Sequence, residues 1–200
     1  MYLKNIIIVI ALSIFFRIFI GEPCHVSSVS MEPLIMDGDW LWIDKASYGA
    51  IMPSSYNDIP FVGTVKKISS QKIFNKKNYR FYGFTDPKIK DIIVLRDPYV
   101  ENILLVKRIF EIIHKDSILS INIENKRLYA SIILEENNSI IEQNDSIFIN
   151  GKCTNIYITN NDYYFVIGDN LENSRDSRDF GYVSKTNIIG KVNYKLLIRK

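Results

Sequence analysis

An apolar segment at the N-terminus constrains this chain more than any other feature. Residues 6–20 are apolar or small, apart from Arg17. A helix over residues 2–21 is roughly 30 Å long, which matches the hydrocarbon thickness of a bilayer. Arg17 would lie near one end of that helix, where its long side chain can reach the interface. We therefore expect residues 1–21 to form a transmembrane helix.

The residues after this segment argue against its removal as a cleaved signal sequence. No A-x-A pattern follows, and Pro23 stands where cleavage would need small, extended residues. The sequence favours an uncleaved, single-pass signal-anchor over a buried core helix. Its orientation is less constrained, because Lys4 favours a cytoplasmic N-terminus while Arg17 on the far side opposes it.

The composition favours strands over helices. The chain has 35 Ile and only 4 Ala, with 12 Tyr and 11 Phe, and β-branched and aromatic residues prefer sheets. We expect a mainly β fold built on an antiparallel sheet. Short apolar runs bounded by turn signals predict strands at 40–43, 91–95, 103–113, 117–123, 147–149, 156–159 and 163–167.

A change of composition divides the part beyond the helix. Residues 116–159 are rich in Asn, Ser and Glu, with apolar residues at alternate positions. Such alternation predicts a β-hairpin with one solvated face. We therefore expect a β core formed by residues 22–115 and 160–200, interrupted by an inserted β subdomain at 116–159.

Charge and cysteine content give no support for a nucleic-acid partner or a zinc site. A net charge of +3 is too small to indicate nucleic-acid binding, which needs a concentrated basic face. Cys24 and Cys153 lack the CxxC spacing, and His25 and His114 do not complete a recognisable zinc ligand set. The cysteines either pair in an oxidising compartment or remain free thiols, and free thiols are the simpler expectation.

A serine-rich loop occupies residues 27–33. A serine hydroxyl is a poor nucleophile until a base removes its proton. His25 lies an odd number of positions before Ser30, so it would point to the opposite face of an extended segment. His114 ends a predicted strand and has no partner motif. The sequence therefore offers no histidine as the base.

Lysine can replace histidine as the base if burial makes its neutral amine accessible near pH 7. This requires its pKa to fall by about 3 units. Residues 103, 105, 107 and 109 share one face of a predicted strand, and all but Lys107 are aliphatic. From this segment alone, an edge-strand lysine that discourages aggregation is the stronger interpretation.

A third segment changes that balance. Residues 168–181 read Gly-Asp-Asn-Leu-Glu-Asn-Ser-Arg-Asp-Ser-Arg-Asp-Phe-Gly and directly follow the predicted strand at 163–167. The ordered combination of SxSMxP at 28–33, a strand Lys107-Arg108 pair and GDNxxNSxDSRxxG resembles the bacterial type I signal peptidases. These are membrane-bound serine proteases with a Ser/Lys dyad. The resemblance extends from the apolar segment to about residue 183.

The resemblance implies roles for individual residues. Ser30 would be the nucleophile and Lys107 the general base, while the Ser28 hydroxyl and the Ser30 backbone N–H would form an oxyanion hole. Ser174 would orient the Lys107 amine. The loop around Ser174 would be held by a pair, Asp176 and Arg178, and its turn would be shaped by Asp169 and Asn170.

The same resemblance implies how substrate is bound. The substrate would add a β-strand to the enzyme and place its residues at −1 and −3 in shallow apolar pockets. Small pockets admit Ala-like side chains and exclude larger ones, which gives cleavage after A-x-A. By position, the pocket residues would be Val26, Met31, Ile35, Leu105 and Val106.

We therefore expect a mainly β serine endopeptidase, anchored by one helix, that removes N-terminal signal peptides from exported preproteins. It should need no metal and no organic cofactor, contact membrane lipid, bind no nucleic acid and be monomeric. Its catalytic part should face the periplasmic or extracytoplasmic side of the bacterial inner (plasma) membrane. Two alternatives stay open: a specialised conjugation or pilus-maturation peptidase of the same family, and a catalytically silent, membrane-tethered β module that binds extended peptides.

Overall fold

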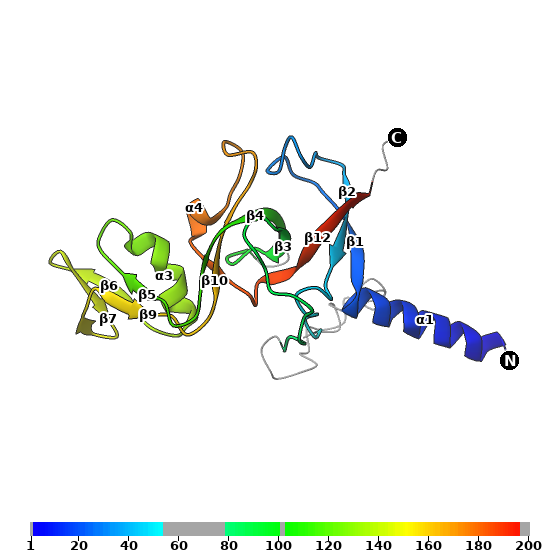
Figure 1. Ribbon diagram of the computed structural model, residues 1–200, viewed down its shortest axis with the longest axis horizontal. Helices are drawn as coiled ribbons and strands as arrows, with labels where there is room; N and C mark the ends of the chain where they lie inside the picture. The colour runs from blue at the N-terminus through cyan, green and yellow to red at the C-terminus, as the bar shows by residue number, and fades with distance from the viewer. Residues whose placement is uncertain (1, 54–78, 101–102, 197–200) are drawn as a thin grey trace. The chain divides into compact units, whose positions relative to one another are not determined.

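The computed structural model describes residues 2–53, 79–100 and 103–196 (Figure 1). The chain forms two compact units. Unit 1 contains residues 1–27, 38–87 and 189–200, and unit 2 contains residues 28–37 and 88–188. Both units are built mainly from antiparallel strands, so the expected fold class is confirmed.

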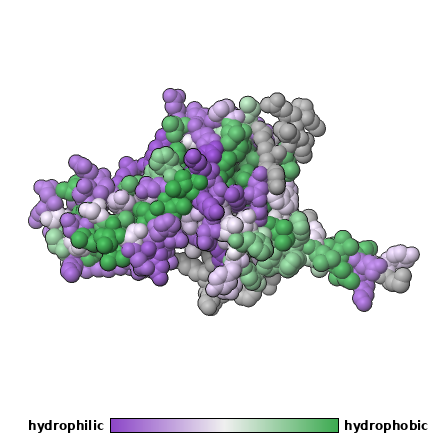
Figure 2. Space-filling model, in the orientation of Figure 1, coloured by the Kyte–Doolittle hydropathy of each residue, from purple (hydrophilic) through white to green (hydrophobic). Residues whose placement is uncertain are grey.

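Unit 1 begins with the expected apolar helix, α1 (Tyr2–Phe19). The helix has 18 residues and a mean hydropathy of 1.9, long and apolar enough to cross a membrane. None of its residues is buried within the protein, and apolar side chains gather along it (Figure 2). In a bilayer, a helix satisfies all of its backbone polar groups internally, which suits this exposed apolar surface.

The sheet of unit 1 consists of β1 (Gly21–His25), β2 (Trp40–Asp44) and β12 (Ile188–Leu196). Both β1 and β12 pair with β2 in antiparallel register. A Cβ at position 21 would lie 2.4 Å from the Ile43 carbonyl oxygen, so the first residue of β1 must be glycine. Leu41 and Ile43 of β2 are fully buried and form the inner face of this sheet.

A charged cluster joins the end of α1 to this sheet. Glu22 of β1 accepts contacts from Arg17 Nε at 2.8 Å and from Lys45 Nζ at 2.7 Å. The Lys45 ammonium also donates to the Arg17 carbonyl at 3.1 Å. Burial raises the pKa of Glu22, but the two neighbouring cations outweigh burial and hold it below its usual range. Arg17 is therefore paired with a carboxylate at the end of the apolar helix.

The main sheet of unit 2 carries four antiparallel strands. β3 pairs with β4, β4 with β10, and β10 with β11. Ile93 of β3 lies opposite Lys107 of β4, and a bulge between Phe165 and Val166 shifts the register of β10 against β4. The strands are β3 (Ile92–Arg96), β4 (Leu104–Ile113), β10 (Tyr163–Ile167) and β11 (Val183–Ser184).

The rest of unit 2 contains two small sheets and two helices. β5 pairs with β9, and β7 pairs with both β6 and β8. Apolar residues from these elements share one core with Ile113 and Tyr163 of the main sheet. The elements are β5 (Ile118–Ser120), α3 (Lys126–Glu135), β6 (Ile140–Gln143), β7 (Ser146–Ile149), β8 (Lys152–Cys153), β9 (Ile156–Ile158) and α4 (Ser177–Phe180).

Each of the seven predicted strands overlaps an observed strand, but the prediction was incomplete. It missed β1, β6, β8, β11 and β12, and it missed helix α3 inside the region expected to be a hairpin. In α3, Leu128 precedes Ile132 and Tyr129 precedes Ile133 by four positions, which is the spacing of one helix face. Ile132 and Ile133 are fully buried, so this face packs into the core.

Candidate active site

Ser30 lies in the loop that follows β1, and this loop segment belongs to unit 2. Its side chain is nearly buried, with 6% of the residue exposed. Asn170 holds the loop: its backbone N–H donates to the Ser30 carbonyl at 3.1 Å, and its side-chain amide donates to the Val29 carbonyl at 3.1 Å. These two bonds fix the backbone on which the Ser30 hydroxyl is presented.

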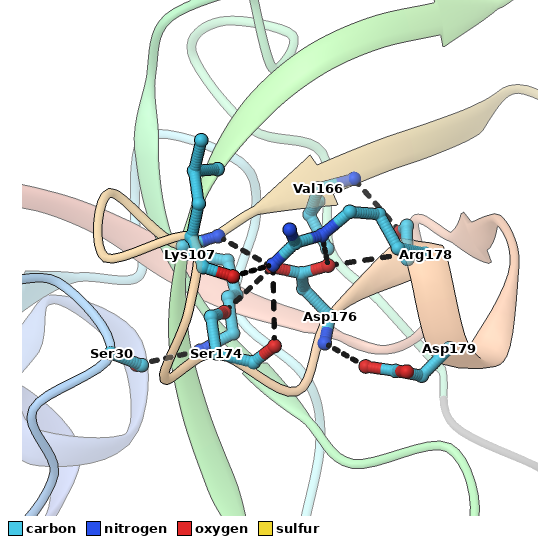
Figure 3. Close-up of polar contacts among 10 residues, drawn as sticks. Ser30, Lys107, Val166, Ser174, Asp176, Arg178 and Asp179 are labelled. Atoms are coloured by element: carbon cyan, nitrogen blue, oxygen red, sulfur yellow. Dashed lines mark hydrogen bonds and ion pairs between the residues drawn. The ribbon is translucent and has the colours of Figure 1, made fainter.

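Lys107 projects from β4 into an aliphatic environment. It is 1% exposed, and its partner across the sheet, Ile93, and its neighbour on the same face, Ile109, are fully buried. The Lys107 Nζ donates a hydrogen bond to Ser30 Oγ at 2.7 Å (Figure 3). The structure thus brings together the two residues that the sequence predicted as base and nucleophile.

Burial changes the acid–base behaviour of this lysine. Desolvation lowers the pKa of Lys107 from 10.5 to about 8, and the nearby negative charge of Asp176 opposes part of that shift. Burial disfavours the charged form of an amine because the low-dielectric interior replaces its hydration. An accessible fraction of neutral amine near pH 7 follows, as general-base chemistry requires.

Ser28 lies beside Ser30 on the same loop. The Ser28 hydroxyl donates to Ser30 Oγ at 3.1 Å and accepts from the Ser30 backbone N–H at 3.2 Å. The hydroxyl and the N–H therefore lie close to each other next to the attacking oxygen. Two adjacent donors near a nucleophile can bind the oxyanion of a tetrahedral intermediate once the Ser28 hydroxyl turns toward substrate.

Asp176 is the centre of the loop at 168–181. Its carboxylate is fully buried, accepts from Ser174 Oγ at 2.6 Å and the Gly168 N–H at 3.0 Å, and pairs with Arg178 Nε at 2.8 Å (Figure 3). It also caps the N-terminus of α4 in a capping box with Asp179. Burial raises the pKa of Asp176, but these hydrogen bonds, led by that from Arg178, hold it below its usual range.

Ser174 is placed next to this carboxylate. Among the contacts of the described residues, its hydroxyl is bonded to Asp176 and not to the Lys107 amine. Asp176 in turn acts on Lys107 through its charge. The connection between Ser174 and the amine is thus indirect in this structure.

Two features at the start of the loop were not singled out from the sequence. Arg108 forms a two-point ion pair with Asp169, at 2.8 and 2.7 Å, which ties the loop to β4. A Cβ at Gly168 would lie 2.2 Å from Ser174 Oγ and 2.5 Å from the Ser30 carbonyl oxygen. Gly168 therefore lets the loop approach the nucleophile. Its position at the start of the motif at 168–181 could have identified it from the sequence.

The residues expected to form substrate pockets have different environments. Met31 and Ile35, which follow Ser30 in its loop, are 1% and 3% exposed. Leu105 and Val106 precede Lys107 on β4 and are half-buried. Val26 belongs to unit 1, where it is buried.

The two cysteines are free thiols in the structure. Cys24 is half-buried in β1, and Cys153 is exposed in β8. Burial, together with the negative charge of Glu22, raises the pKa of Cys24. This thiol is therefore less reactive than a free cysteine.

Comparison with known proteins gives a consistent result. A family model described as "Signal peptidase, peptidase S26" matches residues 1–197. Three curated relatives are each named "Signal peptidase I". The relative from Buchnera aphidicola subsp. Baizongia pistaciae is 28% identical over 215 residues, covering 88% of this chain and 69% of its own. The relative from Rickettsia typhi is 30% identical over 204 residues (93% and 75%), and that from Aquifex aeolicus is 23% identical over 219 residues (94% and 80%).

Proposed function

This chain belongs to the signal peptidase family, peptidase S26, and from that membership we propose that it cleaves signal peptides with Ser30 as the nucleophile and Lys107 as the general base. Membership makes it a serine peptidase that removes signal peptides. The observation that carries the assignment of residues is the 2.7 Å contact between Lys107 Nζ and Ser30 Oγ, inside an aliphatic environment.

The chemistry begins with a proton transfer across that contact. In its neutral form, the Lys107 amine has a lone pair that accepts the hydroxyl proton as Ser30 Oγ attacks the scissile carbonyl carbon. The resulting ammonium gives its proton to the nitrogen of the departing amine, which leaves an ester on Ser30. The Lys107 amine then takes a proton from a water molecule, which attacks the ester. The ammonium returns that proton to Ser30 Oγ as the signal peptide leaves with a free carboxyl group.

The negative oxygen that forms in each step needs donors. The Ser28 hydroxyl and the Ser30 N–H supply them, supported by their position beside Ser30 Oγ. Asn170 assists by binding the carbonyls of Val29 and Ser30, and the Val29 carbonyl belongs to the same peptide group as the Ser30 N–H. A rigid backbone keeps the donors in place before charge develops, so little reorganisation is required during the reaction.

Residues of the loop at 168–181, together with Arg108, position the base. Ser174 bonds to Asp176, which presents its charge toward Lys107. Arg178 neutralises much of that charge, and this limits how strongly Asp176 favours the ammonium form. Asp169 anchors the start of the loop through Arg108. The loop therefore orients the Lys107 amine while the pKa of that amine remains low.

The substrates are preproteins that carry signal peptides. We assign their small side chains at −1 and −3 to pockets lined by Met31, Ile35, Leu105 and Val106 of unit 2. The support for this assignment is local: Met31 follows the nucleophile, and Leu105 and Val106 precede the base with part of their surface open. Pockets of limited volume reject large side chains sterically.

The membrane places the enzyme near these substrates. We assign residues 1–21 to the anchor, residues 22–115 and 160–200 to the catalytic core, and residues 116–159 to an inserted subdomain. A hydrogen bond from the Asp116 N–H to the Thr159 carbonyl at 2.8 Å supports the limits of the insertion. The catalytic part works as a monomer on the outer side of the bacterial plasma membrane, where exported preproteins emerge.

The test is cleavage of a purified preprotein by the full-length protein in detergent. Ser30→Ala and Lys107→Ala should each abolish cleavage, while the wild-type protein releases the mature domain. Ser27→Ala, in the same loop, and Lys115→Ala, an exposed lysine, are matched controls that should keep wild-type rates. Cleavage by Ser30→Ala at the wild-type rate would refute the mechanism. Cleavage of one preprotein among several unrelated ones would indicate a specialised member of the family.

A further inference from the structure

Arg175 lies between Ser174 and Asp176 in the loop at 168–181, but its side chain has a different partner. Its Nη1 lies 2.8 Å from Oδ2 of Asp97, and its Nη2 donates to Asp97 Oδ1 at 3.4 Å. Asp97 is separated from Arg175 by 78 positions in the sequence. The contact therefore joins two segments that the chain order does not bring together.

Asp97 directly follows β3 and organises the turn that leads to β4. Its backbone N–H donates to the Ile103 carbonyl at 2.9 Å, and its Oδ1 accepts the N–H groups of Tyr99 at 2.8 Å and Val100 at 3.0 Å. The carboxylate is fully buried. Within the described parts of the chain, Oδ2 makes no hydrogen bond of suitable angle, and its close contact is the ion pair with Arg175 Nη1. The Arg175 guanidinium is thus the cation that compensates this buried charge.

The turn at Asp97 belongs to the hairpin that carries Lys107. Strands β3 and β4 pair from Ile92 to Arg96, and Lys107 lies opposite Ile93. Arg175 itself lies in the loop between Ser174 and Asp176, whose side chains are hydrogen-bonded to each other. One ion pair therefore connects the hairpin of the base to the loop whose charge acts on that base.

Two other arginines bind carboxylates of the loop, but neither makes this connection at its middle. Arg108 ties the start of the loop to β4 through Asp169. Arg178 pairs with Asp176, two positions away, so its ion pair stays inside the loop. The Arg175 contact fixes the middle of the loop, directly beside Ser174 and Asp176.

We propose that Arg175 and Asp97 are positioning residues for catalysis, and that their ion pair holds Ser174 and Asp176 at a fixed distance from Lys107. The proposal rests on the Ser30/Lys107 mechanism described above. Neither residue touches the reacting atoms. Small displacements of groups that position a base reduce turnover because proton transfer needs a defined geometry.

A purely stabilising ion pair would behave differently. It would change the fraction of folded protein, but each folded molecule would keep its turnover number. A positioning role instead lowers kcat while KM stays near its wild-type value, because substrate still binds in the ground state. The split between kcat and KM therefore separates the two roles.

The experiment uses the full-length protein in detergent and a preprotein substrate. Asp97→Asn keeps an oxygen for the turn at Tyr99 and Val100 but removes the charge, and Arg175→Met removes the guanidinium at similar length. Each should lower kcat roughly ten- to hundredfold with KM little changed. The double variant should be no worse than either single variant, because both changes break the same pair.

Two further variants complete the test. Arg175→Lys keeps the cation and should recover part of the lost kcat; it also serves if Arg175→Met does not fold. Lys126→Met removes an ion pair with Glu142 in the insertion, at 2.9 Å, and should leave kcat unchanged.

The results distinguish failure of the positioning proposal from failure of the Ser30/Lys107 mechanism. Wild-type kcat in both Asp97→Asn and Arg175→Met, at an assay temperature below their unfolding midpoints, would overturn the positioning proposal. Losses that simply multiply in the double variant would overturn it as well. If the Ser30→Ala variant cleaves in the same assay, the Ser30/Lys107 mechanism itself has failed. An effect of the Arg175 variants would then have to act through a base other than Lys107.

Discussion

Lys107 Nζ and Ser30 Oγ lie 2.7 Å apart although 77 positions separate the two residues in the sequence. The contact depends on a strand that buries its lysine and on a loop whose carbonyls are bound by Asn170. Neither element is reactive by itself. The arrangement lowers the pKa of the Lys107 amine to about 8 and directs that amine at one hydroxyl.

Removal of the Ser28 hydroxyl should impair the chemical step more than substrate binding. Ser28→Ala deletes one of two oxyanion donors, and such a donor is worth roughly 10²- to 10³-fold in kcat. Steady-state cleavage of a preprotein measures this loss, with KM expected to stay near the wild-type value. Ser28→Thr keeps a hydroxyl and should retain more activity than Ser28→Ala. Equal activity of wild type and Ser28→Ala would exclude this residue from the oxyanion hole.

Neutralising Asp176 should destabilise the catalytic loop. Asp176→Asn places an amide among donors from Gly168, Ser174 and Arg178. Because Arg178 is itself 41% exposed, the cost is that of the lost charge-assisted hydrogen bonds, about 2 kcal/mol. Chemical unfolding of the full-length protein in detergent measures this change in the free energy of unfolding. Glu142→Gln, which breaks a partly exposed ion pair, is the matched control and should cost less than about 1 kcal/mol. Equal stabilities of the two variants would contradict the central role of Asp176.

Replacing the base should stabilise the fold while abolishing activity. The pKa of Lys107 falls from 10.5 to about 8 on folding, so the unfolded chain binds a proton that the folded chain releases between these pH values. The penalty of the buried ammonium is thus fully present below pH 8 and disappears as the pH rises toward 10.5. Lys107→Met should raise the free energy of unfolding by roughly 2 to 3 kcal/mol at pH 7, less the hydrogen bond to Ser30.

The control for this prediction is pH itself. The stability difference between Lys107→Met and wild type should shrink when unfolding is measured near pH 10, where the wild-type amine is neutral in the folded protein. A constant difference at both pH values, or a destabilised variant at pH 7, would show that burial of charge at this position carries no penalty.

The sequence predicted much of the site because its chemistry follows strand periodicity. The alternation of residues 103, 105, 107 and 109 placed Lys107 among aliphatic side chains, and the motifs at 28–33 and 168–181 indicated its partners. The direction of the Ser174 hydroxyl toward Asp176 could not be predicted, because it depends on the local turn. The Arg175–Asp97 pair was equally hidden, since it joins a loop to a distant turn and neither residue lies in a periodic pattern.

The fold class was predicted, but not every element of the fold. Most of the longer strands were found, although the nine-residue β12 was missed. β8 and β11, with two residues each, are too short to show a period. Helix α3 was missed although most of its residues are good helix formers, because the alternation of apolar residues before it was extended across the whole of 116–159. Its formation depends on burying Ile132 and Ile133 in the core of unit 2, which is a tertiary effect.

The central claim is that a neutral Lys107 activates Ser30, and the pH dependence of kcat/KM tests it most directly. Because activity requires the deprotonated amine, kcat/KM should be maximal above pH 8 and fall about tenfold per pH unit below the pKa of about 8. Asp176 remains ionised over this range, since its pKa lies below its usual value, so the acid limb reports the lysine. A limb near pH 8 is the result we predict. A rate that stays flat from pH 9 down to pH 5 would contradict the account.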